Sequence, residues 1–388
     1  MLLKIEIINY IIYMHIGISM KKRLIEYIGR IQEGGAEALV KDYALLLDKE
    51  KFNVIVLCDD VRNGSANYKI LIDNNIKVVS LFGNHRFICR VLRRVFGGRF
   101  RALLFDKKIK ELKPDIIHAH LESLETLRYS KQLDGIKLFY TCHNPPEMMI
   151  GSGNIKEHQA AEYLLKKYRM RFIALHNEMA EEINIMFSID NCAVIRNAID
   201  FDRFANLNAN REEVRKTLNI PNDAYVVGNN GRFVYQKNHE FLINVFSKIN
   251  SINKNSYLLL IGRGTLEEDI KKQISELGLN DNIRILSNRS DVPELLNAMD
   301  VFVFPSRFEG LGISLIEAQI MKLPCVVSQA IPSEAIQSNL ITKLSLNDSL
   351  DLWVDQCLNP ISNVKEFGNI ENYNMKKEIK HLENLYLD

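Results

Sequence analysis

The segment from Asp300 to Val327 restricts the possible folds of this chain most strongly, because it contains two apolar runs separated by a helical pattern. Val301–Phe304 is uninterruptedly apolar, which is typical of a strand buried on both faces of a parallel sheet. Pro305 ends that strand, Ile313–Met321 has the apolar spacing of a helix, and Cys325–Val327 begins another strand. The segment therefore predicts a parallel α/β sheet with a loop at the carboxyl end of a strand, where such sheets bind ligands.

Two glutamates stand in this segment, Glu309 in the loop and Glu317 about one turn inside the predicted helix. The neighbouring Gly310 and Gly312 allow backbone amides to approach a ligand, and a helix start offers unpaired N–H donors. An ionised carboxylate accepts two hydroxyl donors at once, so the pattern favours a ligand with several hydroxyls. The alternative is that both glutamates are solvated surface residues.

Composition excludes several classes of protein. A length of 388 residues is enough for two α/β domains with a core each, and a net charge of +2 argues against a general nucleic-acid binder. The six cysteines are scattered, which predicts reduced thiols in a cytoplasmic protein. No apolar stretch reaches the roughly 20 residues of a membrane span. The first nineteen residues lack the order of a signal peptide, and we expect translation to begin at Met20.

Strand and helix patterns alternate twice along the chain, with a polar, asparagine-rich linker at 197–223 between the two series. Such alternation predicts parallel sheets covered by helices. We therefore expect one α/β domain in residues 20–200, a second in residues 201–365, and a carboxyl-terminal helix within residues 366–388.

Residues 86–108 carry eight Lys and Arg residues against the single acid Asp106, with apolar residues between them. A basic amphipathic stretch of this kind can lie on an anionic membrane surface, at about 1 kcal/mol per basic residue near the lipid. The alternative is an ordinary solvated helix face.

Histidines follow two of the predicted strands. His143 comes where an apolar strand ends before two prolines, and it is a candidate site residue. On a strand, His118, His120 and Glu122 would point to one side, as metal ligands do. No further ligand cluster accompanies them, so we expect no metal.

Two places in the chain could contact phosphate groups. Gly34 and Gly35 stand at the start of a predicted helix, where the dipole and free amides favour an anion, although helix starts often contain glycine. Arg232 and Lys237 follow the end of a strand in the same half as Glu309, and both cations can bind phosphate oxygens. A surface location is the alternative for these two cations. Diphosphate and hydroxyl contacts at one sheet edge would suit a nucleotide sugar.

Together these motifs resemble the retaining glycosyltransferases of family 4, which have the GT-B fold. The resemblance covers most of the chain from Met20 and rests on four motifs: Gly34–Glu37, Thr141–His143, Gly231–Lys237 and Glu309–Glu317. The seven-residue gap between Glu309 and Glu317 is specific in its context, whereas the Gly-Gly and His motifs are individually weak. The amino-acid sequence from Ser306 to Ala335 is most similar to that of exopolysaccharide and capsule biosynthesis transferases.

The resemblance implies two Rossmann-like domains facing across a cleft. Residues 20–200 would bind a lipid-linked or other saccharide acceptor, residues 201–365 would bind a UDP-sugar, and the final helix would cross back to the first domain. A hexose or N-acetylhexosamine would be transferred with retention of configuration, in surface polysaccharide biosynthesis. The resemblance implies no metal and no cofactor, and a cytoplasmic protein at the inner face of the membrane.

The resemblance also assigns roles in the second half of the chain. Arg232 and Lys237 would neutralise the departing diphosphate, which would be the main contribution of the protein to catalysis. Glu309 would hold sugar hydroxyls, together with backbone amides around Leu311 and Gly312.

Further roles are implied around these residues. Glu317 would hold the ribose hydroxyls, and His143 would contact the sugar near its anomeric carbon. Gly35, with Gly34 before it, would leave room for the donor phosphate, and Arg289 would approach the base. One departure is Gly262–Gly264, with Arg263 where the family often has aspartate, which leaves the base pocket less defined.

Two other functions stay open at this point. A nucleotide-sugar epimerase can share the fold, but it would need an added acid/base pair, and the sequence contains no clear one. A non-catalytic subunit of a transferase complex would have no need of intact Arg232, Lys237, Glu309 and Glu317.

Overall fold

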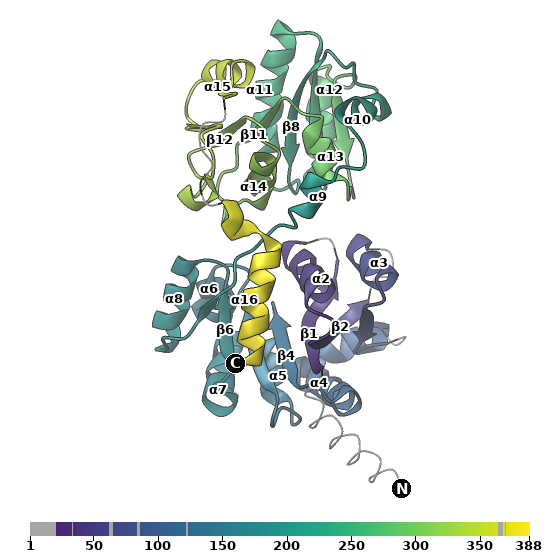
Figure 1. Cartoon of the computed structure of the whole chain (residues 1–388), viewed down its shortest axis with the longest axis vertical. Helices are drawn as coiled ribbons and strands as arrows, with labels where there is room; N and C mark the ends of the chain where they lie inside the picture. Colours follow the sequence, from purple (N-terminus) through teal and green to yellow (C-terminus); the bar gives the residue numbers. More distant parts are fainter. Residues whose placement is uncertain are drawn as a thin grey trace. The chain divides into compact units, whose positions relative to one another are not determined.

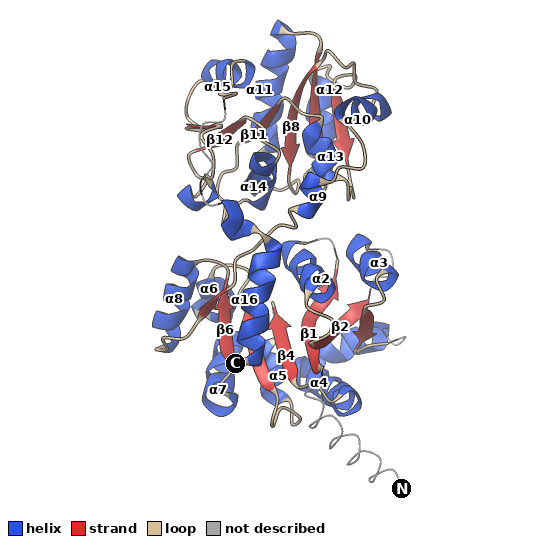
Figure 2. Cartoon of the chain, viewed as in Figure 1, coloured by secondary structure: helices blue, strands red, loops and turns tan. Residues whose placement is uncertain are grey.

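The computed structural model describes residues 21–32, 34–61, 65–83, 86–121, 123–363, 368 and 370–388, and for residues 86–97 it describes the backbone alone. Met20, where we expect translation to begin, lies outside the described residues. The chain forms two α/β units (Figures 1 and 2). One unit runs to Asn197 and includes Lys376–Asp388, and the other comprises Ala198–Met375.

The first unit contains a seven-stranded parallel sheet of order β3-β2-β1-β4-β5-β6-β7. Its strands are β1 (Lys22–Ile31), β2 (Phe52–Val61), β3 (Lys77–Ser80), β4 (Ile116–His120), β5 (Lys137–Thr141), β6 (Arg171–Ala174) and β7 (Ala193–Val194). Its helices are α2 (Gly35–Leu46), α3 (Ala66–Asp73), α4 (Arg86–Leu112), α5 (Leu124–Tyr129), α6 (Pro146–Ile150), α7 (Ile155–Tyr168), α8 (Asn177–Phe187) and, from Lys376 onward, α16 (Met375–Leu387).

Alternate residues of β1 enter different layers of the first unit. Ile25 and Tyr27 belong to the larger core cluster, whereas Ile28 belongs to the cluster on the other face. Since side chains alternate along a strand, Glu26 shares the face of Ile28. Glu26 also pairs in register with His118 of β4, so these two side chains are neighbours on that face.

The second unit contains a six-stranded parallel sheet of order β10-β9-β8-β11-β12-β13. Its strands are β8 (Tyr225–Asn230), β9 (Ser256–Ile261), β10 (Ile283–Leu286), β11 (Val301–Phe304), β12 (Cys325–Ser328) and β13 (Ile341–Leu344). Its helices are α9 (Asp202–Ala205), α10 (Arg211–Thr217), α11 (His239–Ile252), α12 (Glu267–Glu276), α13 (Val292–Asn297), α14 (Ile313–Ile320) and α15 (Leu350–Leu358).

The prediction for residues 300–327 is confirmed, because β11, α14 and β12 follow one another there. Phe302 and Phe304 of β11 enter one core cluster and Val301 and Val303 enter the other, so both faces of the strand are buried. This double burial is what requires an uninterrupted apolar run.

Helix α4 is 27 residues long and contains the basic stretch. The described basic side chains of α4 do not all face solvent. Arg99 is exposed, but Arg101 is buried and pairs with Asp59 of β2 at 3.3 Å, where Tyr27 also donates to Asp59. Arg101 is therefore a core residue, and the expectation that the whole stretch contacts a membrane does not extend to it. Among the described residues, no helix is long and apolar enough to cross a bilayer.

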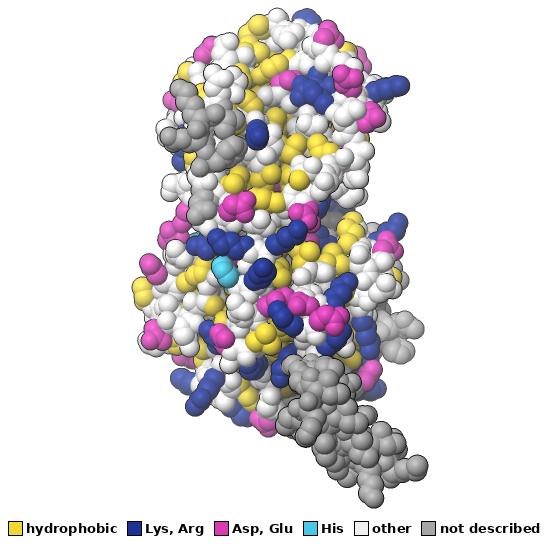
Figure 3. Space-filling view, viewed as in Figure 1, with side chains coloured by type: hydrophobic (Ala, Val, Ile, Leu, Met, Phe, Trp, Pro, Cys, Tyr) yellow, Lys and Arg dark blue, Asp and Glu magenta, His cyan; other side chains and the backbone are white. Residues whose placement is uncertain are grey.

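Both signs of charge occur on the drawn face of each unit (Figure 3), as expected for a net charge of +2. A buried arginine forms an ion pair in the second unit. Arg215 of α10 is 1 % exposed and donates to Asp300 at 2.8 Å, and Asp300 also accepts from the backbone N–H of Val226 at 2.7 Å. Asp300 therefore joins α10 to the starts of β8 and β11.

We expect Asp300→Ala to lower the free energy of unfolding of the second unit by roughly 3 kcal/mol, because the buried Arg215 guanidinium loses its counter-charge. Urea unfolding followed by the fluorescence of Trp353 measures this, since Trp353 is the single tryptophan and lies buried in the same unit. Glu268→Ala is the control, because its ion pair with Lys271 is exposed and contributes little. Equal unfolding midpoints for the two variants would contradict the role of Asp300.

Candidate functional site

Most of the predicted donor-contacting residues lie in the loops that follow the carboxyl ends of β8 and β11, or in the helix after β11. In the sheet order, β9 lies on one side of β8 and β11 lies on the other. The loops that follow β8 and β11 therefore begin at the point where the strand order reverses, and ligands bind there in open α/β sheets.

Several hydrogen bonds join these two loops. The backbone N–H of Arg307 donates to the Gln236 carbonyl at 2.8 Å, and the Gln236 amide donates to the Phe308 carbonyl at 3.0 Å. The Asn238 amide donates to the Pro305 carbonyl at 3.2 Å, and the Arg307 guanidinium donates to Asn238 Oδ1 at 2.8 Å. Because of these bonds, the two loops hold side chains from distant parts of the chain in fixed positions.

Lys237 and Glu309 form an ion pair at the centre of these loops. Lys237 Nζ lies 2.7 Å from Glu309 Oε1 and 4.5 Å from the centroid of the Phe304 ring, and Gln236 donates to Glu309 Oε2 at 3.3 Å. Burial lowers the pKa of Lys237, and Glu309 opposes that shift. The exposed Arg232 lowers the pKa of Lys237 further, so its charge acts on the lysine. The structure thus brings together three of the predicted site residues.

Gly312 precedes helix α14, and Glu317 lies within that helix. Asn230, the last residue of β8, donates to Glu317 Oε2 at 3.1 Å. Gly312 has a φ of 81° and precedes α14 without a side-chain cap, and a Cβ there would lie 3.3 Å from the Phe304 ring. The half-buried Leu311 precedes it. The loop therefore requires glycine, and Gly312 itself provides no side-chain cap for the amide donors of the first turn of α14.

The loop after β9 packs directly on the loop after β8. A Cβ at Gly262 would lie 2.1 Å from the Gly231 carbonyl oxygen, and one at Gly264 would lie 2.3 Å from that of Phe233. The Phe233 N–H donates to the Arg263 carbonyl at 2.9 Å. The two glycines thus serve backbone packing, and Arg263 between them does not interrupt it.

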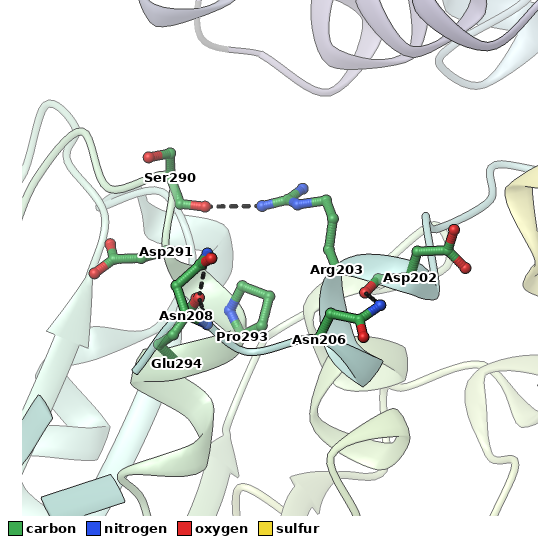
Figure 4. Close-up of a pocket in the computed structure, with 8 residues that line it drawn as sticks. All are labelled: Asp202, Arg203, Asn206, Asn208, Ser290, Asp291, Pro293 and Glu294. Atoms are coloured by element: carbon green, nitrogen blue, oxygen red, sulfur yellow. Dashed lines mark hydrogen bonds between the residues drawn. The ribbon is translucent and has the colours of Figure 1, made fainter. Parts of the chain in front are cut away.

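Arg289 lies elsewhere, in the loop after β10. It donates from Nε to Asp291 Oδ1 at 2.7 Å, and no hydrogen bond or ion pair of the described residues joins it to Lys237 or Glu309. A pocket of about 310 Å³ lies beside this loop, where Arg203 donates to the Ser290 carbonyl at 2.8 Å (Figure 4). Its lining residues are Asp202, Arg203, Asn206, Asn208, Ser290, Asp291, Pro293 and Glu294. The base contact implied for Arg289 stays a prediction.

The first unit has an equivalent reversal of strand order, because β2 and β4 lie on opposite sides of β1. Helix α2 begins there, after Gly34, which provides no side-chain cap. A Cβ at Gly35 would have nothing within 4 Å, so this glycine leaves open space at the helix start.

A buried network of side chains lies at this reversal. His120 Nε2 lies 2.7 Å from Glu26 Oε2, and His120 Nδ1 lies 2.9 Å from His143 Nε2. Tyr386 of α16 donates to Glu26 Oε1 at 3.1 Å. His118 Nδ1 lies 2.6 Å from the Tyr386 hydroxyl. The Thr141 hydroxyl lies 2.7 Å from His118 Nε2. We call these residues the histidine network: Glu26, His118, His120, His143, Tyr386 and Thr141.

The first three members of the network stand where metal ligands could. One ligand atom from each of Glu26, His118 and His120 lies within 4.8 Å of the others. All four ring nitrogens of the two histidines already have protein partners, so the residues form a complete hydrogen-bonded set. Glu122, which the sequence grouped with these histidines, lies outside the described residues.

Burial determines the charges in this network. Glu26 is fully buried, which opposes ionisation, but His118 and His120 hold its pKa at about 2. Burial and the charge of His118 lower the pKa of His120 to about 4, and burial lowers the pKa of His143 well below its ordinary value. At neutral pH the network therefore holds an ionised Glu26 beside neutral His120 and His143.

Comparison with known proteins agrees with this architecture. Residues 33–203 match the family model described as Glycosyltransferase Family 4, and residues 210–342 match the one described as glycosyl transferases group 1. The chain therefore consists of two glycosyltransferase domains, one of family 4 and one of group 1. The resemblance that the motifs indicated is thereby confirmed.

Two relatives of this glycosyltransferase match it over most of its length. One is the UDP-Gal:alpha-D-GlcNAc-diphosphoundecaprenol alpha-1,3-galactosyltransferase of Escherichia coli, 26 % identical over 88 % of this chain and 91 % of that protein. Another is the putative glycosyltransferase EpsF of Bacillus subtilis, 26 % identical over 87 % of each chain.

Solved structures confirm the GT-B fold. A glycosyltransferase from Rickettsia africae has a TM-score of 0.70 at 19 % identity, covering 95 % of this chain and 98 % of that one. Anabaena HepE, solved in complex with UDP and glucose, has a TM-score of 0.66 at 19 % identity, covering 94 % and 95 %. The predicted pair of Rossmann-like domains is therefore correct.

The histidine network predicts that the protein loses stability in mild acid. The unfolded chain binds a proton on His120 below about pH 6.5, whereas the folded chain does so only near pH 4. Stability therefore falls as the pH drops through this window, by about 2 kcal/mol at pH 5 for this one group. Glu26 adds a further loss between about pH 4.5 and 2.

Urea unfolding followed by circular dichroism at pH 7 and pH 5 measures this loss. His120→Gln is the matched variant, because it removes one titrating group and should reduce the loss of stability between pH 7 and pH 5 by about 2 kcal/mol, leaving the part due to other buried histidines such as His143. The same slope in His120→Gln and in the original chain would contradict the assignment to His120.

Proposed function

We propose that this glycosyltransferase transfers a hexose or N-acetylhexosamine from a UDP-sugar to a lipid-linked or other saccharide acceptor, with retention of configuration, in surface polysaccharide synthesis. The supporting observation is the ion pair of Lys237 with Glu309 between the loops that follow β8 and β11, where the charge of Arg232 acts on Lys237 and Glu317 lies on the adjacent helix α14. Cations suit a diphosphate and carboxylates suit hydroxyls, and a nucleotide sugar carries both.

Each part of the nucleotide-sugar donor would contact a different residue of these loops and of helix α14. Lys237, assisted by Arg232, contacts the diphosphate, and the uncapped amides at the start of α14 add donors. Glu309 keeps lone pairs for sugar hydroxyls while Lys237 and Gln236 hold its orientation. Glu317, oriented by Asn230, accepts from the ribose hydroxyls.

Catalysis would depend mainly on charge. As the bond to the sugar breaks, negative charge grows on the diphosphate, and a fixed, largely buried ammonium stabilises that charge more than water does. Lys237 is 12 % exposed in its side chain, so it is both reachable and poorly hydrated. The acceptor would attack on the face that the diphosphate leaves, with a phosphate oxygen as base, which retains configuration without a metal or another cofactor.

The relatives support the classes of donor and acceptor. The name of the Escherichia coli enzyme gives a UDP-sugar as donor and a diphosphoundecaprenol-linked sugar as acceptor, and HepE was solved with UDP-glucose. A polyprenyl acceptor lies in a membrane, so a cytoplasmic position at its inner face would suit this chain. An epimerase of the same fold and a non-catalytic subunit remain the competing functions.

We expect Lys237→Ala and Glu309→Ala each to reduce UDP release by on the order of a hundredfold, because each removes a preorganised charge at the reacting centre. The assay follows UDP released from UDP-glucose, UDP-galactose and their N-acetylhexosamine counterparts, with and without a polyprenyl-diphosphate sugar acceptor. Lys272→Ala, on the exposed face of α12, is the control.

The same assay separates the three functions. Acceptor-dependent UDP release supports the transferase. Interconversion of the sugar without a second acceptor would indicate the epimerase, and no turnover of any donor would favour the non-catalytic subunit. Near-normal rates for both Lys237→Ala and Glu309→Ala would sink the proposed site.

For membrane contact, we expect replacement of Arg90, Arg93 and Arg94 by glutamine to weaken binding to anionic vesicles by on the order of a hundredfold, at about 1 kcal/mol per basic residue. Arg101 is left unchanged because it pairs with Asp59 in the core. Sedimentation with phosphatidylglycerol vesicles measures the binding.

The matched control replaces three exposed lysines of the second unit, Lys254, Lys271 and Lys272, by glutamine. It removes the same charge from a different place, so it should leave vesicle binding within a few-fold of the original. An equal loss in both triple variants would show that net charge, and not α4, determines the binding.

A further inference from the structure

We propose that Glu26 and His120 are positioning residues that hold His143 as the neutral tautomer protonated on Nε2, so that its Nδ1 is the hydrogen-bond acceptor offered to a sugar hydroxyl. The order of protons follows from the geometry of the described residues together with the ionised state of Glu26 and the neutral state of His120. Its consequence for catalysis rests on the proposed function.

The direction of the hydrogen bonds begins at Glu26. Its ionised carboxylate can only accept, and it is 2.7 Å from His120 Nε2, so that nitrogen carries the proton. A neutral imidazole has one donor and one acceptor, which leaves His120 Nδ1 as an acceptor. His143 Nε2, at 2.9 Å, must then donate to it, and His143 Nδ1 is left without a proton.

Further partners hold Glu26 in this role. Tyr386 donates to Oε1 at 3.1 Å, and His118 Nδ1 lies 3.3 Å from Oε2. Since the Tyr386 proton points to Glu26, its oxygen accepts from His118 Nδ1, while His118 Nε2 lies 2.7 Å from the Thr141 hydroxyl. Both arms of the network agree with an ionised Glu26, and neither requires it to donate.

Other groups around the network do not reverse this order. Tyr43 of α2 faces the rings of His118 and His120, at 6.0 and 6.5 Å between centroids, and is fully buried. Burial and the charge of Glu26 keep its hydroxyl protonated by raising its pKa well above the ordinary value. Burial is the main cause that keeps the His143 ring neutral, and the nearby His120 and His118 act in the same direction, against Glu26.

The neutral tautomer suits the reaction chemically. Sugar transfer passes through positive charge at the anomeric carbon, and a protonated imidazole would repel that charge. An unprotonated Nδ1 can instead accept a hydroxyl proton in a hydrogen bond. Among the described residues, His143 Nδ1 has no hydrogen-bond partner, whereas Nε2 does. Glu26 and His120 would thus act on the sugar only through His143.

The test is the tautomer of His143 in the full-length protein, read from long-range ¹H–¹⁵N spectra of ¹⁵N-histidine-labelled chain at pH 7. The signal that is absent from the spectrum of His143→Gln is assigned to His143. We expect His120 and His143 both to be neutral and protonated on Nε2. A His143 ring that is cationic, or protonated on Nδ1, would overturn the proposal. This outcome requires neither a variant that alters Glu26 nor an activity assay.

Glu26→Gln is the diagnostic variant, because a carboxamide can donate as well as accept and no longer sets the direction. We expect a mixture of His143 tautomers and a kcat lowered about 10- to 100-fold, with KM for the UDP-sugar changed less than about threefold. Tyr27→Phe is the matched control. It removes a buried tyrosine hydrogen bond, to Asp59 at 3.1 Å, from the next residue of β1 on the other face of the sheet.

The outcomes separate the two proposals. If Glu26→Gln keeps both the tautomer and kcat, or if Tyr27→Phe changes them as much, the positioning role is wrong. If Zn²⁺ at one equivalent shifts the signals of His118 and His120, the cluster is a metal site instead. If the original chain transfers no sugar but shows the Nε2 tautomer, the proton order stands and the proposed function fails.

Discussion

In each unit, the point where the strand order reverses determines where polar side chains can come together. A strand buried on both faces tolerates few charges, so polar groups collect where neighbouring loops leave the sheet in different directions. The second unit places Lys237 and Glu309 there, between the loops of β8 and β11. The first places Glu26 and His120 there, between β1 and β4. Function in both units thus depends on topology before it depends on any single side chain.

The sequence was sufficient to predict these helices and strands, but not the contacts between side chains of distant loops. The apolar run Val301–Phe304 and the helix after Gly312 are local patterns, and both were correctly predicted. Arg232, Lys237 and Glu309 were expected at one sheet edge, because each follows a strand. The ion pair between Lys237 and Glu309 was not predicted, since it spans 72 positions and depends on hydrogen bonds between two loops. Gln236 and Asn230 were missed for the same reason.

The histidine network shows where local reasoning fails. His118 and His120 alternate on a strand, which correctly indicated a shared face, but the acid was sought in the adjacent Glu122. The acid that reaches them is Glu26, which is paired with His118 through sheet register. Its signal was available, because a carboxylate inside the apolar strand β1 requires a partner. The partner hydroxyl of Tyr386 lies 360 positions away, and no local pattern could indicate it.

The two polar clusters treat charge in opposite ways, and the difference follows from burial. Lys237 and Glu309 stay partly accessible, so an incoming diphosphate can compete for the lysine while the ion pair keeps it in place. Glu26 is fully buried, and its charge is tolerable only because several hydrogen-bond donors surround it. A charge that no ligand can reach cannot bind substrate. What it can do is orient its neighbours, which is why a buried carboxylate behind His143 suits positioning better than catalysis.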